Sequence, residues 1–134
     1  KKAGALIGLV DITAQKKAEQ ILQKYASIDE MTGFMNKRSG LNFLEQAIEN
    51  SGQQGEPLSV VFVDVDGLKQ VNDRYGHEEG DYYIQQIAKV IRGNVDSQDV
   101  VFRYGGDEFV LILLNCSKET AHKILKRIVA KLGE

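Results

Sequence analysis

The stretch VVFRYGGDEFVLILL, residues 100–114, contains two strand-like runs separated by a pair of glycines. The centre of a two-residue hairpin loop requires a positive φ, which glycine adopts without steric cost. The stretch therefore predicts an antiparallel hairpin with Gly105 and Gly106 in its loop. In that register Arg103 faces Glu108 as an ordinary cross-strand ion pair, and Asp107 at the tip has no partner. An acid at a hairpin tip is commonly just solvated.

A second apolar run, LSVVFVDVD at residues 58–66, is rich in β-branched residues and does not alternate. This pattern predicts a central strand covered on both faces. We expect it to neighbour the hairpin, which brings its acidic end close to Asp107. Magnesium usually binds one or two carboxylates together with substrate phosphates, and Asp64 with Asp107 provides such a pair. Asp66 has a second interpretation, because it occupies the position of a helix N-cap.

Helical periodicity accounts for most of the remaining chain, with apolar stripes in residues 37–50, 68–75, 78–95 and 118–132. Together with the strands, this order predicts an α/β fold of the α+β sandwich kind, in which helices flank a central, mostly antiparallel sheet. In a β-α-β-β-α-β arrangement a closing strand follows the last helix. We therefore expect the C-terminal part of the domain to be missing from this chain.

The first 28 residues differ from the rest of the chain. Residues 4–13, GALIGLVDIT, predict a short apolar strand, and residues 14–28 carry Ala18, Ile21 and Leu22 at helical spacing. That helix either pairs with a copy of itself or packs on the domain's own core. The stripe is too short to distinguish a coiled coil from an ordinary amphipathic helix.

Composition excludes several classes of protein. The 134 residues are 43% hydrophobic and 27% charged, which suits one compact domain, and the net charge of -2 with mixed signs argues against a nucleic-acid partner. Cys116 is the only cysteine, so no intrachain disulfide forms, and we expect it to be buried filler. No apolar run approaches the roughly 18 residues that span a bilayer. We expect a cytoplasmic fragment without direct membrane contact, whose full-length parent could be membrane-anchored.

Residues after the second apolar run favour an anion site beside the metal. The backbone amides of Gly67 and Leu68 lie at the start of the next predicted helix, where free amides and the helix dipole attract phosphate. The ammonium of Lys69 adds positive charge, although a lysine there is more often a solvated surface residue. Asn72 lies three residues further along and faces the same side of the helix as Lys69.

An acid in the following segment completes a possible base-binding site. Asp81, in YGHEEGD, is expected at the start of the next helix, where it could equally be a cap or a first-turn acid. A carboxylate can accept two parallel hydrogen bonds from the ring N–H and exocyclic amine of guanine, and adenine lacks that donor pair. Asn72 with Asp81 therefore indicates selection of guanine.

Three segments in this order and spacing closely resemble the GGDEF domain of diguanylate cyclases: DEMTGFMNKR (29–38), DVDGLKQVNDRYGHEEGD (64–81) and RYGGDEF (103–109). Such enzymes condense two GTP into cyclic di-GMP. The resemblance implies a fold akin to the palm of nucleic-acid polymerases and nucleotide cyclases. It places the GGDEF domain at residues 29–134. Separately, GLVDITAQKKAEQIL (8–22) resembles the final strand of a PAS sensory domain running into a signalling helix, which implies a PAS-like C-terminal strand at residues 1–12 and a linker or signalling helix at 13–28.

The resemblance also implies roles for the site residues. Asp64 and Asp107 would ligate Mg²⁺ or Mn²⁺ with the backbone carbonyl of Val65, and Glu108 would support the metal or the reactive hydroxyl. The remaining matched positions would bind GTP: Gly67, Leu68 and Lys69 its phosphates, Asn72 and Asp81 its guanine, and Gly105 and Gly106 its phosphates and sugar through close approach of the backbone.

The implied function is condensation of two GTP into cyclic di-GMP and pyrophosphate by a homodimer under control of an upstream PAS-like domain. The alternative is a catalytically silent GTP-binding or dimerisation module. A third class, a cyclic di-GMP receptor, would use the family's Arg-x-x-Asp product site, but the corresponding stretch here is DSQD, with Asp96 in place of the arginine. The segment DGLK also lacks the aromatic residues that the family more usually has before the lysine. This replacement is expected to be neutral, because the backbone amides bind the phosphates at this place.

Overall fold

The computed structural model describes residues 14–22 and 27–133. Its elements are α2 (Lys37–Gln54), β1 (Leu58–Asp64), α3 (Leu68–Tyr75), α4 (His77–Arg92), β2 (Val100–Gly105), β3 (Glu108–Leu114) and α5 (Lys118–Leu132). Residues 14–22 form a further helix with exposed side chains. The predicted bounds of α3 and α5 are confirmed, whereas α2 continues to Gln54 and α4 ends at Arg92. The strand and PAS-like segment predicted within residues 1–13 lie outside the described residues.

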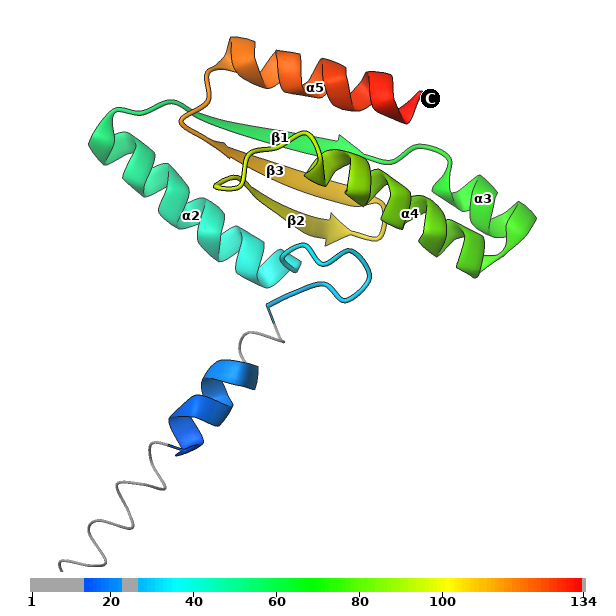
Figure 1. Ribbon diagram of the computed structural model, residues 1–134, viewed down its shortest axis with the longest axis horizontal. Helices are drawn as coiled ribbons and strands as arrows, with labels where there is room; N and C mark the ends of the chain where they lie inside the picture. The colour runs from blue at the N-terminus through cyan, green and yellow to red at the C-terminus, as the bar shows by residue number, and fades with distance from the viewer. Residues whose placement is uncertain (1–13, 23–26, 134) are drawn as a thin grey trace, which may run out of the picture.

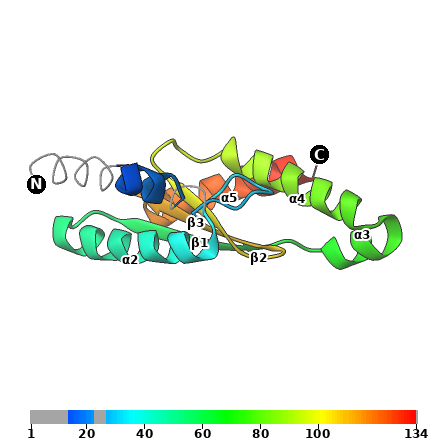
Figure 2. The ribbon, with the colours of Figure 1, turned by 90° about the horizontal axis from the view of Figure 1, so that it is seen from below.

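The strands form an antiparallel sheet of order β1-β3-β2 within the described part of the chain. Helix α2 covers one face of this sheet, and α4 and α5 cover the other (Figures 1 and 2). Helix α3 extends past the end of the sheet at which β1 finishes (Figure 1). This arrangement confirms the predicted α+β sandwich and brings the ends of β1 and the β2–β3 hairpin to the same side of the molecule.

Alternating residues of β3 supply both faces of the sheet with core side chains, as the period of a strand requires. Phe109, Leu111 and Leu113 pack toward α4 and α5, whereas Val110 and Ile112 pack toward α2. All five side chains are buried. β3 is therefore the central strand that anchors the two helical layers.

The placement of β1 corrects the sequence-based prediction of a central strand. β1 pairs only with β3 among the described residues and is an edge strand there. Val60 and Phe62, which point to the α2 side, remain 47% and 55% exposed, because α2 lies mainly over β2. A β-branched run without alternation does not distinguish an edge strand from a central one, since this depends on which partner strands are present.

Capping and one close contact fix α2 over β2. The Asn36 side chain accepts a hydrogen bond from the Ser39 amide at 2.9 Å, and Gly55 ends the helix with a φ of 66°. Inside the helix, a β-carbon at Gly40 would overlap the ring of Phe102. The absence of a side chain at position 40 thus allows α2 to rest directly on β2.

Two further predictions concern single properties of the chain. Cys116 is buried in the core on the α4 and α5 side, as expected for a lone structural cysteine. Burial is also the main cause of its raised pKa. Across residues 14–22 and 27–133, no helix is both long and apolar enough to cross a membrane.

Candidate active site

The sheet register brings three of the predicted acidic residues together. Asp64, the last residue of β1, lies opposite Glu108, the first residue of β3. One step further along, the amide of Val65 donates a hydrogen bond to the backbone carbonyl of Asp107 at 2.7 Å. The predicted adjacency of β1 and the hairpin is therefore confirmed, and these acids occupy one end of two paired strands.

The acids have no counter-charge within the described residues. No ion pair or side-chain hydrogen bond there engages Asp64, Asp107 or Glu108. Asp64 is exposed and the other two are partly buried. Oxygen ligands without a protein cation suit a hard divalent cation. Among the described residues no three His, Cys, Asp or Glu side chains form a ready-made metal cage.

The hairpin itself differs from its predicted form. Arg103 pairs with Phe109 and Gly105 pairs with Glu108, with a register shift between Arg103 and Gly105. The turn therefore consists of Gly106 and Asp107, and neither Gly105 nor Gly106 has a positive φ. The predicted Gly-Gly loop was wrong because an irregularity in β2 moves the turn by one residue. Instead, Gly105 leaves room for the Glu108 carboxylate, which a β-carbon at position 105 would meet.

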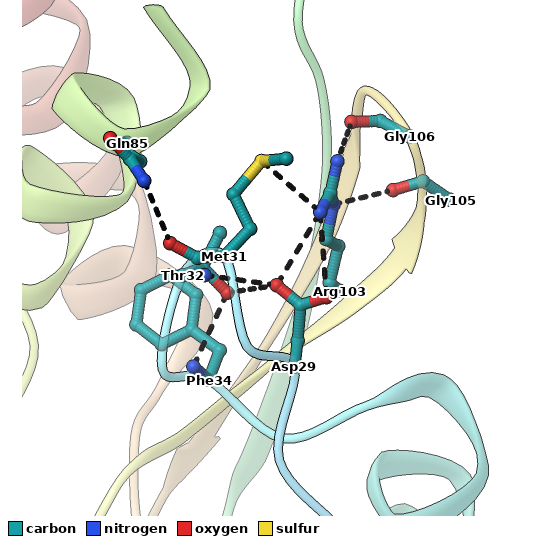
Figure 3. Close-up of polar contacts among 8 residues, drawn as sticks. All are labelled: Asp29, Met31, Thr32, Phe34, Gln85, Arg103, Gly105 and Gly106. Carbon is teal, nitrogen blue, oxygen red and sulfur yellow. Dashed lines mark hydrogen bonds and ion pairs between the residues drawn. The ribbon is translucent and has the colours of Figure 1, made fainter. Parts of the chain in front are cut away.

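Arg103 does not form the predicted pair with Glu108. Its guanidinium forms an ion pair with Asp29 at 3.4 Å and donates to the carbonyl oxygens of Gly105 at 3.2 Å and Gly106 at 2.8 Å (Figure 3). The corrected register explains this change, because Arg103 no longer lies opposite Glu108. Glu108 is thus left without a basic partner within the described residues.

The predicted phosphate-binding residues lie at the β1–α3 junction. Gly67 is the N-cap residue of α3 with a φ of 85°, a conformation that favours glycine. Leu68 packs partly into the core, and Lys69 is exposed in the first turn. The N-cap position of α3 is Gly67, and it has no side-chain capping hydrogen bond. The prediction that Asp66 is the N-cap residue was therefore wrong. The free amides therefore remain available at this end of α3.

The predicted guanine-binding residues meet where α3 packs on α4. The side-chain oxygen of Asn72 lies against Gly80, the neighbour of Asp81. Asp81 is exposed and lies in the second turn of α4, which begins at His77, so it is neither a cap nor a first-turn acid. The structure thus places Asn72 beside the segment that carries Asp81.

Two features of the site were missed by sequence reasoning. The hydroxyl of Tyr83 on α4 donates a hydrogen bond to the Asp66 carbonyl at 3.1 Å and so connects α4 to the loop between β1 and α3. The turn at residues 29–34 contacts both the hairpin and α4 (Figure 3). DEMTGF was recognisable as a motif, but only the fold shows which elements it joins.

Comparisons with known proteins identify the family of this chain. The family described as "Diguanylate cyclase, GGDEF domain" matches residues 26–134. The chain is 33% identical over 114 residues to the diguanylate cyclase DosC of Escherichia coli (strain K12), covering 85% of this chain and 25% of that protein. It is 30% identical over 130 residues to the cyclic di-GMP phosphodiesterase PdeB of Shewanella oneidensis, covering 97% of this chain and 15% of that protein.

Among solved structures, the GGDEF domain of DgcB from Caulobacter crescentus in complex with c-di-GMP aligns with a TM-score of 0.74 and 28% sequence identity. The alignment covers 77% of this chain and 60% of that one. The chain belongs to the GGDEF domain family. It spans about a quarter of the length of DosC.

Proposed function

We propose that this chain is a diguanylate cyclase domain, which condenses two GTP into cyclic di-GMP with release of pyrophosphate. The observation that carries the proposal is the pairing of β1 with β3, which places Asp64 opposite Glu108 and joins Val65 to Asp107. Membership of the family and the similarity to DosC support it.

In this proposal the acidic end of the sheet holds Mg²⁺ or Mn²⁺ through the carboxylates of Asp64 and Asp107 and the carbonyl of Val65. Such a metal, when bound, neutralises charge on the phosphates and activates the attacking oxygen. Glu108, whose carboxylate lies against Gly105, supports the metal or the reactive hydroxyl in this proposal.

The substrate extends from the hairpin toward α3 and α4. The amides of Gly67 and Leu68 and the ammonium of Lys69 bind the phosphates, since free amides at a helix start attract anions. Asn72 and Asp81 bind guanine at the α3–α4 contact. Gly106 lets phosphate and sugar approach the backbone, since a β-carbon there would meet no protein atom within 4 Å, whereas the space beside Gly105 is taken by the Glu108 carboxylate.

The reaction joins two nucleotides, each held by one domain. The 3′-oxygen of one GTP forms a bond to the α-phosphorus of the other, the bond from that phosphorus to the β-phosphate oxygen breaks, and pyrophosphate leaves. Two such steps close the ring. Because each domain holds one GTP, the active form is a two-fold homodimer. An upstream PAS-like domain in a cytoplasmic region of the parent protein controls its assembly.

The test is to incubate the chain with GTP and magnesium or manganese and to separate the products by chromatography with mass detection. Cyclic di-GMP is the expected product, with E. coli DosC as the positive control. Its absence, under conditions in which DosC produces it, would contradict the cyclase proposal for this chain.

The second candidate is a catalytically silent GTP-binding or dimerisation module. It is favoured by the similarity to PdeB, whose name describes a phosphodiesterase although nearly all of this chain aligns with it. Comparing GTP turnover with GTP binding separates the two candidates: both bind a fluorescent GTP analogue in a titration, but the silent module forms no product.

A further inference from the structure

The side chain of Arg103 joins two parts of the chain that are distant in sequence. Its guanidinium contacts the Asp29 carboxylate at 3.4 Å and donates to the carbonyls of Gly105 and Gly106, the residues directly before Asp107 (Figure 3). A guanidinium is planar and presents its donors in a rigid fork. The orientation of Arg103 therefore constrains the backbone that leads into Asp107.

Asp29 is itself held by its own turn. One carboxylate oxygen accepts hydrogen bonds from the amide of Thr32 at 3.0 Å and from its hydroxyl at 2.7 Å. The backbone of Asp29 also bonds in both directions, from its amide to the Phe34 carbonyl and from the Gly33 amide to its carbonyl, each at 2.8 Å. The carboxylate that meets Arg103 is thus a fixed point rather than a mobile surface acid.

The same turn reaches α4, the helix that carries Asp81. Gln85 donates to the Met31 carbonyl at 3.4 Å, and Arg92 donates to the Thr32 carbonyl (Figure 3 shows the first of these). On the hairpin side, the ring of Phe34 packs edge-on against Phe109 with centroids 5.8 Å apart. Residues 29–34 therefore touch both halves of the candidate active site.

We propose that Asp29 and Arg103 are a positioning pair that sets the backbone of residues 105–107 and, through it, the place of Asp107 beside Asp64. The consequence for catalysis rests on the proposed function, whereas the effect on the turn does not. Neither residue touches substrate in this proposal. Their contribution is to hold the Asp107 carbonyl where it accepts a hydrogen bond from the Val65 amide. A displacement of residues 29–34 would therefore also move Asp107, at the acidic end of the sheet.

The partial burial of the pair favours this role over an ordinary surface ion pair. The side chains of Arg103 and Asp29 are 16% and 21% exposed, so solvent screens them less than it screens a surface pair. Arg103 also bonds to two carbonyls of the turn, and loss of the carboxylate leaves its charge with neutral acceptors only. The guanidinium of Arg103 then loses the charged partner that restrains its orientation most strongly.

The first arm of the test measures the turn without any nucleotide. Asp29→Asn keeps the shape of the side chain and an acceptor for Thr32 but removes the charge. We expect amide hydrogen exchange, followed by NMR, to accelerate at Val65 and across residues 105–108, while the amides of α5 stay unchanged. Unchanged exchange at Val65 would overturn the proposal whether or not the chain is a cyclase.

The second arm measures turnover. Asp29→Asn and Arg103→Lys should each lower kcat about tenfold, as expected for loss of one charge-assisted hydrogen bond, with KM for GTP nearly unchanged. Lysine keeps the positive charge but lacks the planar, forked set of donors of a guanidinium, so it should not restore the wild-type kcat. The double variant should be no slower than Arg103→Lys alone, because Asp29 acts through Arg103. Additive losses would contradict the proposal.

Asp99→Asn is the matched control. Asp99 is likewise a partly buried acid, and it accepts the amides of Leu114 at 2.9 Å and Asp96 at 3.0 Å, at the opposite end of the sheet. It should lower thermal stability without changing kcat or the exchange of Val65. A fall in kcat in this control equal to that of Asp29→Asn would reduce the effect to general destabilisation and overturn the positioning role. Wild-type chain without turnover would instead count against the proposed function.

Discussion

The side-chain oxygen of Asn72 on α3 lies against the backbone of Gly80 on α4, closer than any side chain at position 80 would allow. Gly80 is buried, and its neighbour Asp81 is exposed. The contact therefore holds Asn72 next to the residue that precedes Asp81, the other residue proposed to bind guanine. It also makes a glycine inside a helix, which normally costs stability, necessary at this place.

Gly80→Ala should weaken GTP binding, because the added methyl group displaces the Asn72 side chain. We expect the dissociation constant for GTP to rise about tenfold, the size of effect that loss of one substrate hydrogen bond produces. Isothermal titration with GTP measures it. Gly93→Ala is the matched control, since a β-carbon there has only ordinary contacts of 3.6 Å and 3.7 Å. Equal affinity of Gly80→Ala and wild type would contradict the assignment of Asn72.

Asp107→Asn should abolish metal-dependent turnover while leaving the fold intact. A metal contributes several kcal/mol to the transition state, so loss of a ligand should reduce kcat at least about 100-fold. The side chain lies at a turn and has little packing to lose, so the free energy of unfolding should change by less than about 0.5 kcal/mol. Product formation and urea denaturation measure the two effects.

Glu119→Gln provides the comparison for Asp107→Asn, because it removes one exposed carboxylate from the first turn of α5, away from the hairpin. Its turnover should equal that of the wild type. Full activity in Asp107→Asn would refute the proposed metal ligands.

Gly40→Ala should destabilise the fold, because the new methyl group overlaps the buried ring of Phe102. Overpacking of this kind costs about 1–3 kcal/mol. Gly52→Ala, in the same helix, should instead stabilise by about 0.5–1 kcal/mol, since a β-carbon there meets nothing within 4 Å and alanine favours helix. Urea denaturation of both variants checks the opposite signs, and a stabilised Gly40→Ala would show that α2 does not rest on β2 as described.

Cys116 should react slowly with iodoacetamide in the folded chain. Burial raises the pKa of its thiol above the ordinary value of 9.0, and the nearby charges of Asp99 and Asp96 raise it further, against an opposing hydrogen bond from Ser59. Since the thiolate is the nucleophile, alkylation followed by mass spectrometry at pH 8 should be much slower than in urea. Equal rates would show that the thiol is exposed.

The same raised pKa makes a prediction about stability. The folded chain favours the neutral thiol, so its contribution is complete below pH 9 and is lost as the pH rises through the folded pKa. Cys116→Ala should therefore reduce the loss of stability between pH 8 and roughly pH 10, the region around an ordinary cysteine pKa. Denaturation curves of both proteins at several pH values measure the difference.

Patterns that repeat along the chain were read correctly. The apolar stripes of α3 and α5 predicted their bounds, and two adjacent β-rich runs with glycines between them predicted the hairpin. The pairing of β1 with the hairpin was also predicted, because the α+β arrangement leaves few alternatives for a strand that ends in acids. The roles of the acidic, phosphate-binding and guanine-binding residues stay predictions.

The residue-by-residue register of the strands could not be predicted from the sequence pattern. The hairpin was placed one residue out of register, which in turn gave Arg103 the wrong partner. A single irregularity in a strand leaves the hydrophobic pattern almost unchanged, yet it exchanges every cross-strand neighbour. The position of β1 at the sheet edge was hidden for a related reason, since burial depends on partner strands and helices.

The sequence by itself determined the set of helices and strands, the family and the residues able to carry chemistry, because periodicity and motif spacing are local properties of the chain. Only the tertiary structure decided that the guanidinium of Arg103 lies between Asp29, 74 positions away, and the carbonyls of Gly105 and Gly106. Contacts of that range depend on strand register and on the packing of helices over the sheet, and both are settled when all the elements fold together.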